Sequence, residues 1–177
     1  MKGVFQELVD KSEHKEVDQG VRTGFSDLDR VLVQLGPADL VLVGARPGMG
    51  KTSFAMNIAV NAAKSTGKTV CIFSLEMSGE QLVNRMLSSE AMVDSHALRT
   101  GEIRPEDWTR IADATAMLAG CELLIDDSSG VTVADMKAKL RRVKNLGLVV
   151  VDYLQLMQAS SNRIVRAPSP RVGLERQ

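Results

Sequence analysis

A glycine-rich segment between an apolar run and a helical pattern constrains this chain more than any other feature. Residues 45–52 read ARPGMGKT, after DLVLV at residues 39–43 and before apolar residues at helical spacing over residues 51–64. A strand, a glycine turn and a helix in this order form a unit of parallel α/β folds, and the helix start directs backbone N–H groups into one hollow. The segment therefore predicts a buried strand, a phosphate-binding loop and a helix.

Apolar runs and amphipathic stretches also alternate along the rest of the chain. Continuous Val/Ile/Leu runs separated by amphipathic helices are typical of parallel sheets covered on both faces. The pattern therefore predicts an α/β fold. The further strands are expected over residues 69–74, 121–125 and 148–151. The helices are expected over residues 79–92, from Pro105 to Leu118, over residues 133–145 after Thr132 as N-cap, and as a short helix opened by a Ser26–Asp29 capping box.

Composition excludes several classes of function. The 177 residues carry a formal net charge of +0, and only 3% are aromatic. A polybasic DNA coat and a platform of stacked rings for single-stranded bases are therefore both absent from the sequence. The two cysteines, Cys71 and Cys121, form no CxxC or Cys/His cluster, and no apolar run reaches the roughly 18 residues that span a bilayer. We expect no membrane segment and a cytoplasmic location.

The residue types of the glycine-rich segment match the chemistry of phosphate binding. Gly48 and Gly50 let backbone N–H groups point inward, Lys51 reaches the β/γ oxygens, and Thr52 presents its hydroxyl to Mg²⁺. The strict pattern has glycine where Ala45 stands, which alanine replaces if its φ is negative. The residues expected to bind the nucleotide are Arg46, Pro47, Gly48, Met49, Gly50, Lys51, Thr52 and Ser53.

Two carboxylates follow expected strands. Asp152 ends the apolar run 148–151, which is the arrangement that holds Mg²⁺ beside a bound nucleotide. Glu76 lies just past the strand 69–74, where ligands of open α/β sheets collect. Its carboxylate either polarises an attacking water or favours the dipole of the next helix, and spacing alone leaves both interpretations open.

Four segments together closely resemble the motor domain of the DnaB-type replicative DNA helicases, which have the RecA-like fold. They are TGFSDLD, ARPGMGKTSFAMNIA, FSLEM and VVVDYLQLM, and the resemblance covers residues 3–157. FSLEM and DYLQLM distinguish the sequence from recombinase and circadian-clock relatives of the same fold. Ala45 is normal for this family.

The resemblance implies roles for individual residues. Lys51 and Thr52 bind ATP·Mg²⁺, Glu76 is the general base for water, and Asp152 supports the metal, so that Glu76 and Lys51 are the expected catalytic residues. Gln155 couples the nucleotide state to the rest of the motor. The resemblance also implies a homo-hexameric ring that acts on single-stranded DNA, with a primase and a helicase loader as partners.

Sequence pattern and resemblance together divide the chain into three parts. Residues 1–19 are expected to form a linker helix, at Val4 to Asp10, and a linker, and this helix resembles one that docks on the adjacent subunit of the ring. Residues 20–157 are expected to form a partial RecA-like ATPase domain, and residues 158–177 a disordered tail with a net charge of about +3.

Motifs that the family carries beyond residue 157 are not identifiable in the sequence. They are a γ-phosphate-sensing residue, DNA-gripping loops and an arginine finger, and the helical N-terminal domain is missing too. The sequence therefore predicts a fragment whose fold is incomplete at the C-terminus. Two functions stay open: an ATP-driven helicase motor, and a nucleotide-binding module without helicase activity that associates with a helicase ring.

Overall fold

The computed structural model describes residues 20–152, and from residue 51 onward its helices and strands follow one another in the predicted order, with one additional helix. The linker helix, Gln155 and the tail lie outside the described residues. None of the helices in the described part is long and apolar enough to cross a membrane. The helices are α2 (Ser26–Leu32), α3 (Lys51–Thr66), α4 (Gly79–Ala91), α5 (Ser95–Thr100), α6 (Asp107–Ala119) and α7 (Val133–Leu140), and the strands are β1 (Thr69–Ser74), β2 (Leu123–Asp126) and β3 (Leu146–Asp152).

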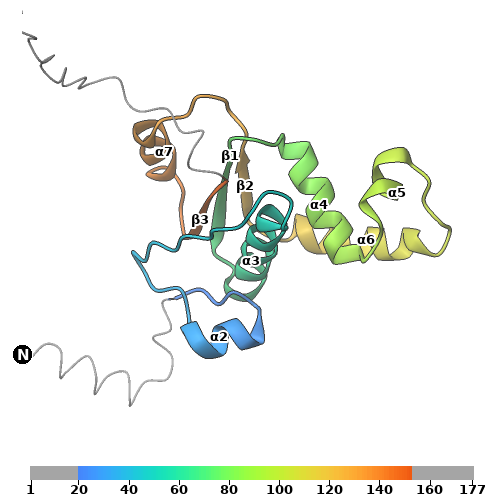
Figure 1. The fold of residues 1–177 in the computed structure, drawn as a ribbon, viewed down its shortest axis with the longest axis horizontal. Coiled ribbons are helices and arrows are strands. Elements are labelled where there is room, and N and C mark those ends of the chain that lie inside the picture. Colours follow the sequence, from blue (N-terminus) through green and yellow to red (C-terminus); the bar gives the residue numbers. More distant parts are fainter. Residues whose placement is uncertain (1–19, 153–177) are drawn as a thin grey trace, which may run out of the picture.

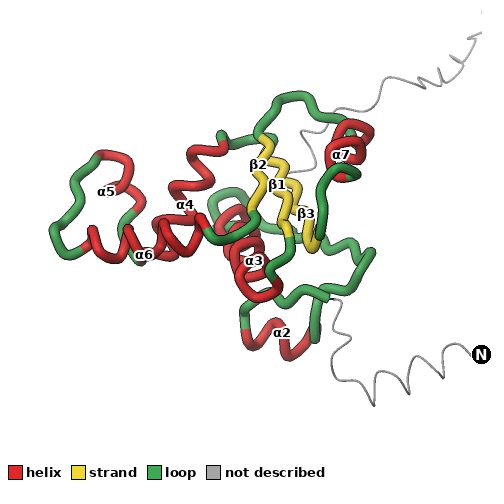
Figure 2. The backbone as a smooth tube through the Cα atoms, turned by 180° about the vertical axis from the view of Figure 1, so that it is seen from behind, coloured by secondary structure: helices red, strands yellow, loops and turns green. Residues whose placement is uncertain are grey.

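The three strands form a parallel sheet in the order β2-β1-β3 (Figure 2). Strand β1 is central, and all six of its residues are buried. Phe73 of β1 lies opposite Asp126 of β2, and Ser74 lies opposite Asp152 of β3. Since parallel strands end at the same edge of a sheet, the carboxyl ends of all three strands meet on one side of the molecule.

Helices cover both faces of the sheet, which confirms the predicted fold class (Figure 1). Val70 and Ile72 pack with residues of α3 and α4, including Met56 and Leu82, into the larger core. On the opposite face, Cys71 and Phe73 pack against Met136 of α7 and its neighbours. A residue period of two along β1 thus sends alternate side chains into two different layers.

A second, smaller body of helices extends from α4 away from the sheet (Figure 1). Its apolar centre joins the end of α4 to α6, and α5 packs against it through two partly buried residues. The buried residues are Ala91, Val93, Ile111 and Ala114, and those of α5 are Ala97 and Leu98. Helix α5 is absent from the helices that the sequence pattern predicted. Asp94 at its N-cap and Gly101 at its C-cap are the signals that mark it, but six residues are too few to show a helical period.

The prediction of a buried strand over residues 39–43 is wrong for the described structure. The segment is not a strand, and Leu40, Leu42 and Val43 are 85%, 70% and 42% exposed. An apolar run forms a strand only where a neighbouring strand makes hydrogen bonds with its backbone N–H and C=O groups. In residues 20–152, β1 already has a neighbour on each side, and the run pairs with neither outer edge of the sheet. Asp39 instead closes a tight turn, with its carboxylate accepting from the Gly36 N–H at 2.8 Å.

The predicted capping box at Ser26 is also wrong, although the helix exists. The N-cap of α2 is Phe25, and no side chain caps the helix. The Asp29 carboxylate instead accepts hydrogen bonds from residues that precede the helix: from the Thr23 N–H and hydroxyl and from the Gly24 N–H. The carboxylate therefore organises the turn before α2.

Other element bounds differ from the sequence pattern by a few residues. Helix α6 begins at Asp107, so Pro105 precedes the helix and is not its first residue. Strand β2 begins at Leu123, two residues late. Thr132 is the N-cap of α7 as predicted, but the helix ends at Leu140 and not near Asn145, because the chain turns there toward β3.

Candidate functional site

A cleft of about 920 Å³ opens beside the glycine-rich loop. One wall comes from the loop and the start of α3, a second from the segment after β1, and a third from α4 and the start of α5. The lining residues are Ala45, Arg46, Pro47, Gly48, Gly50, Lys51, Thr52, Ser53, Met56, Asn57, Glu76, Met77, Arg85, Ser88, Ser89 and Ser95.

The loop leaves the N-terminus of α3 open to a ligand. Gly48 and Gly50 have φ angles of 77° and 83°, in the left-handed region that favours glycine. A Cβ atom at either position would meet nothing within 4 Å, so glycine is needed here for its backbone conformation and not for space. No side chain caps α3, whereas Ser78 caps α4 and Thr132 caps α7. The first N–H groups of α3 therefore suit an anion.

Lys51, Thr52 and Asp152 converge behind this loop. The Lys51 Nζ lies 2.9 Å from Asp152 Oδ1, and the Thr52 hydroxyl donates to Asp152 Oδ2 at 2.6 Å. The Asp152 side chain is only 3% exposed and stands at the carboxyl end of β3. Its charge is thus compensated by one cation and one hydroxyl donor.

The oxygen atoms at this point fit a magnesium ion bound together with a phosphate chain. The Thr52 hydroxyl and the Asp152 carboxylate are hard oxygen donors on adjacent elements. The described residues contain no group of three or more His, Cys, Asp or Glu side chains that could hold a metal alone. Mg²⁺ commonly takes few protein ligands and completes its shell with substrate phosphates and water, which is the donor set available here.

Glu76 lies exposed on the cleft wall in a turn that is held from both sides. The Ser74 hydroxyl donates to the Met77 carbonyl at 2.6 Å and accepts from its N–H at 3.3 Å. The capping box of Ser78 and Gln81 then starts α4. Glu76 precedes this N-cap, and the acid in the first turn of α4 is Glu80. The position suited to the helix dipole is therefore taken by a different residue.

Most of the predicted site residues line the same cleft. Met49 is not among the lining residues and is exposed, and Asp152 contacts the cleft through Lys51 and Thr52. The sequence pattern missed the third wall, which Arg85, Ser88 and Ser89 provide. The signal that could have found them is the spacing of three and four residues that places them on one face of α4.

The fold and this cleft define a protein of the P-loop NTPase class: a parallel sheet, an uncapped helix after a glycine turn, and a carboxylate at the end of a neighbouring strand. Residues 20–169 match the family described as the DnaB-like helicase C terminal domain. The chain belongs to this family, and its fold is RecA-like.

Curated relatives of the chain are replicative DNA helicases. The chain is 48% identical over 144 residues to the replicative DNA helicase DnaB of Geobacillus stearothermophilus, a match that covers 80% of the chain and 32% of the relative. It is 46% identical over 166 residues to DnaB of Haemophilus influenzae, covering 89% of the chain and 36% of the relative. The matched part thus spans about a third of the length of these relatives.

Two solved structures are similar to this chain over most of its length. A structure titled as a DnaB-like replicative helicase and its interactions with primase gives a TM-score of 0.78 at 25% identity, covering 92% of the chain and 40% of that protein. A second structure, titled as an ATPase domain, gives a TM-score of 0.77 at 27% identity, covering 90% of the chain and 60% of that domain's chain.

Proposed function

We propose that the chain binds and hydrolyses ATP with Mg²⁺ as part of the motor of a replicative DNA helicase. The observation that carries the proposal is the junction of Lys51 and Thr52, at the start of an uncapped helix, with Asp152 at the end of β3. The three side chains come from the two motifs that phosphoryl-transfer enzymes of this class require. Membership of the helicase family supports the same reaction.

In this proposal each wall of the cleft has a separate task. The open N–H groups at the start of α3 bind the phosphate chain, and Lys51 leaves Asp152 to contact the β- and γ-phosphate oxygens. Thr52 and Asp152 provide oxygen ligands for Mg²⁺, directly or through water. Bound Mg²⁺ supplies charge neutralisation at the β- and γ-phosphates during transfer.

Glu76 is the proposed general base. It accepts a proton from a water molecule while the water oxygen attacks the γ-phosphorus, and the bond from that phosphorus to the bridging oxygen of ADP breaks. ADP and inorganic phosphate result. The fixed turn between Ser74 and Ser78 supports this role, since it presents the Glu76 carboxylate at the carboxyl edge of the sheet and on the cleft wall.

The proposed setting is a homo-hexameric ring in the cytoplasm that moves along single-stranded DNA. Relatives named as replicative DNA helicases support DNA as the substrate. The hexameric ring and the single-stranded form of the DNA are proposed from the resemblance of the sequence motifs to DnaB-type helicases. A similar structure whose title names interactions with primase supports a primase as partner, and we propose a helicase loader by the same family argument. The alternative, a nucleotide-binding module without helicase activity, becomes an outcome of the experiment.

Titration of the purified chain with a fluorescent ATP analogue tests the proposal. Lys51→Ala should abolish binding, because it removes the cation that contacts the phosphates. Lys64→Ala is the matched control: Lys64 also lies on α3 and also pairs with a carboxylate, Glu90 at 3.0 Å, but it does not line the cleft. Equal affinity in wild type and Lys51→Ala would contradict the assignment.

Forked-duplex unwinding, measured on the same chain and on the chain extended with the remainder of a related motor, separates the two functions. Unwinding by the extended protein alone supports the motor. Nucleotide binding without unwinding in either protein favours the nucleotide-binding module.

A further inference from the structure

Arg85 is the one basic side chain that the α4 wall brings into the cleft among the residues described. In residues 20–152 the other arginine that lines it is Arg46, which belongs to the glycine-rich loop. Ser88 and Ser89 line the cleft from the same face of α4, three and four residues after Arg85. The guanidinium therefore faces the loop from a separate structural element.

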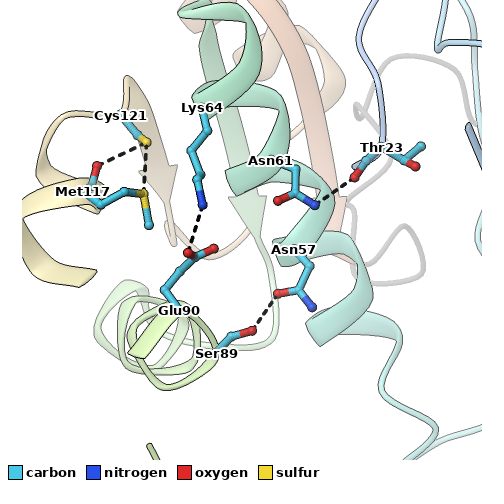
Figure 3. A network of polar contacts seen from close by, with 8 residues as sticks. All are labelled: Thr23, Asn57, Asn61, Lys64, Ser89, Glu90, Met117 and Cys121. Carbon is cyan, nitrogen blue, oxygen red and sulfur yellow. Dashed lines mark hydrogen bonds and ion pairs between the residues drawn. The ribbon is translucent and has the colours of Figure 1, made fainter. Parts of the chain in front are cut away.

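Contacts with α3 fix this face of α4. The Ser89 hydroxyl donates to Asn57 Oδ1 at 3.0 Å, and the Lys64 Nζ lies 3.0 Å from Glu90 Oε2 (Figure 3). Leu82 and Met86, on the buried side of α4, pack in the same core as α3. The backbone of Arg85, one helical turn before Ser89, is thus held beside the first turns of α3.

The direction of a helical side chain places the guanidinium near the reacting end of the cleft. Long side chains on a helix point back toward its N-terminus. For α4 that end is Ser78, two residues after Glu76. We therefore expect the Arg85 side chain, which lines the cleft, to extend toward the turn that carries the proposed general base.

Arg85 has no protein counter-charge in the described part of the chain. Arg30 pairs with Asp27 and Arg110 pairs with Asp107, but no hydrogen bond or ion pair joins Arg85 to any described residue. Asp152 is engaged by Lys51 and Thr52. A guanidinium in this position matches a phosphate group, which it can bind through two parallel N–H···O bonds.

We propose that Arg85 binds the terminal phosphate of a nucleoside triphosphate in the same chain and thereby distinguishes the triphosphate from the diphosphate. The proposal rests on the proposed function and adds a residue that neither the glycine-rich loop nor the strand-end carboxylate supplies. The N–H groups of the loop contact the phosphates that ATP and ADP share, and Lys51 contacts both the β- and the γ-phosphate. Arg85 contacts only the γ-phosphate, which ADP lacks. Charge neutralisation at that phosphate also favours attack by water.

Calorimetric titration with a non-hydrolysable ATP analogue and with ADP, each with Mg²⁺, tests this assignment on the 177-residue chain. Arg85→Ala should weaken binding of the ATP analogue by about 10-fold, as loss of a charge-assisted hydrogen bond does, and binding of ADP by less than about twofold. Arg85→Lys keeps the charge without the planar fork and should give an intermediate loss for the ATP analogue. Arg99→Ala, at an exposed arginine of α5 outside the cleft, is the control and should change neither affinity.

The outcomes separate this inference from the proposed function. Equal losses for both nucleotides, or no loss, in a folded Arg85→Ala protein would overturn the role of Arg85 while Lys51→Ala still abolishes binding. If Lys51→Ala binds ATP as the wild type does, the proposed function fails, and the role of Arg85 fails with it. Circular dichroism of each variant identifies any loss of fold, and Arg85→Lys then gives the comparison between ATP and ADP.

Discussion

Thr52 and Asp152, 100 residues apart in the sequence, are joined by a 2.6 Å hydrogen bond from the threonine hydroxyl to the carboxylate Oδ2. The bond ties the first turn of α3 to the end of β3, and the same carboxylate also binds Lys51. The packing of α3 on the sheet produces this meeting, because residues of α3 share one core with Leu148 and Val150 of β3. The two residues that we propose as Mg²⁺ ligands are thus in direct contact with each other in the protein.

Asp152→Asn should remove most of the Mg²⁺ dependence of ATP binding. With Mg²⁺ present, affinity for ATP should fall about 10-fold, and with a chelator the difference from wild type should shrink, because the amide is a weaker metal ligand. Asp126→Asn is a matched control: Asp126 also ends a strand and pairs with a lysine, Lys139, but it lies outside the nucleotide cleft. Titration with and without the chelator measures both. An unchanged Mg²⁺ dependence in Asp152→Asn would contradict the metal role.

Glu76→Gln should separate chemistry from binding. A general base contributes mainly to the chemical step, so single-turnover hydrolysis of ATP should slow by about 100-fold or more while ATP affinity stays within about twofold. Glu80→Gln removes the neighbouring first-turn carboxylate of α4 and should leave the hydrolysis rate unchanged. A normal rate in Glu76→Gln would contradict the role of Glu76 as general base.

The elements that could be predicted from sequence are those marked by the residue types of a short, continuous segment. The apolar run Thr69–Ser74 predicts a strand, and all six of its residues are buried in the structure. Thr132 is predicted as an N-cap from its residue type, and its hydroxyl accepts from the Asp135 N–H. The glycine loop and Asp152 could be placed because their chemistry requires a strand end and a helix start. These features depend on a few neighbouring residues.

Features that depend on a distant partner could not be predicted. The apolar run at residues 39–43 lacks a neighbouring strand in the described structure, and no pattern within five residues reveals that. Asp29 sits three residues after Ser26 but bonds to Thr23 and Gly24, because those N–H groups precede the helix and need an acceptor. Arg85 joins the cleft only through the packing of α4 on α3.

Leu82→Ala should destabilise the chain by about 2 to 5 kcal/mol, since the change leaves a cavity in the main core. Leu82 is 0% exposed and packs from α4 into the core that α3 and β1 also form. Val83→Ala, at the next residue and 47% exposed, should cost less than about 1 kcal/mol. Urea unfolding followed by circular dichroism gives both values. Equal destabilisation by the two variants would mean that α4 packs through a different face.

Asp29→Asn should lower stability in a manner that depends on pH. Hydrogen bonds from the side chain and backbone of Thr23 and from the Gly24 N–H hold the pKa of Asp29 below its usual range. A carboxyl whose pKa is lower in the folded state adds stability above its unfolded pKa of about 4 and loses it as the pH falls through the folded value. Wild type should therefore be the more stable protein at pH 7, and the difference should shrink below about pH 4.

The control for Asp29 is Asp27→Asn, because Asp27 is an exposed carboxylate of the same helix that pairs only with Arg30 in the described structure. Its urea midpoint should change little at either pH. The turn that Asp29 holds also contacts α3, where the Asn61 side chain donates to the Thr23 carbonyl at 3.0 Å (Figure 3). A constant difference between wild type and Asp29→Asn across the pH range would contradict the charge-based explanation.

The exposed apolar residues 40–43 should make the purified chain self-associate. Four consecutive apolar side chains face solvent, and β3 has one outer edge that is unpaired within the described residues. Exposed apolar runs and free strand edges both favour contact with a second chain. Sedimentation velocity should show a mean mass that rises with concentration, and the double variant Leu40→Lys/Leu42→Lys should shift this rise to higher concentration. Met92→Lys, at an isolated exposed methionine, is the control and should not. If the double variant instead melts well below the wild type, then residues 39–43 pack inside the folded chain in solution, as the apolar pattern of the sequence first indicated.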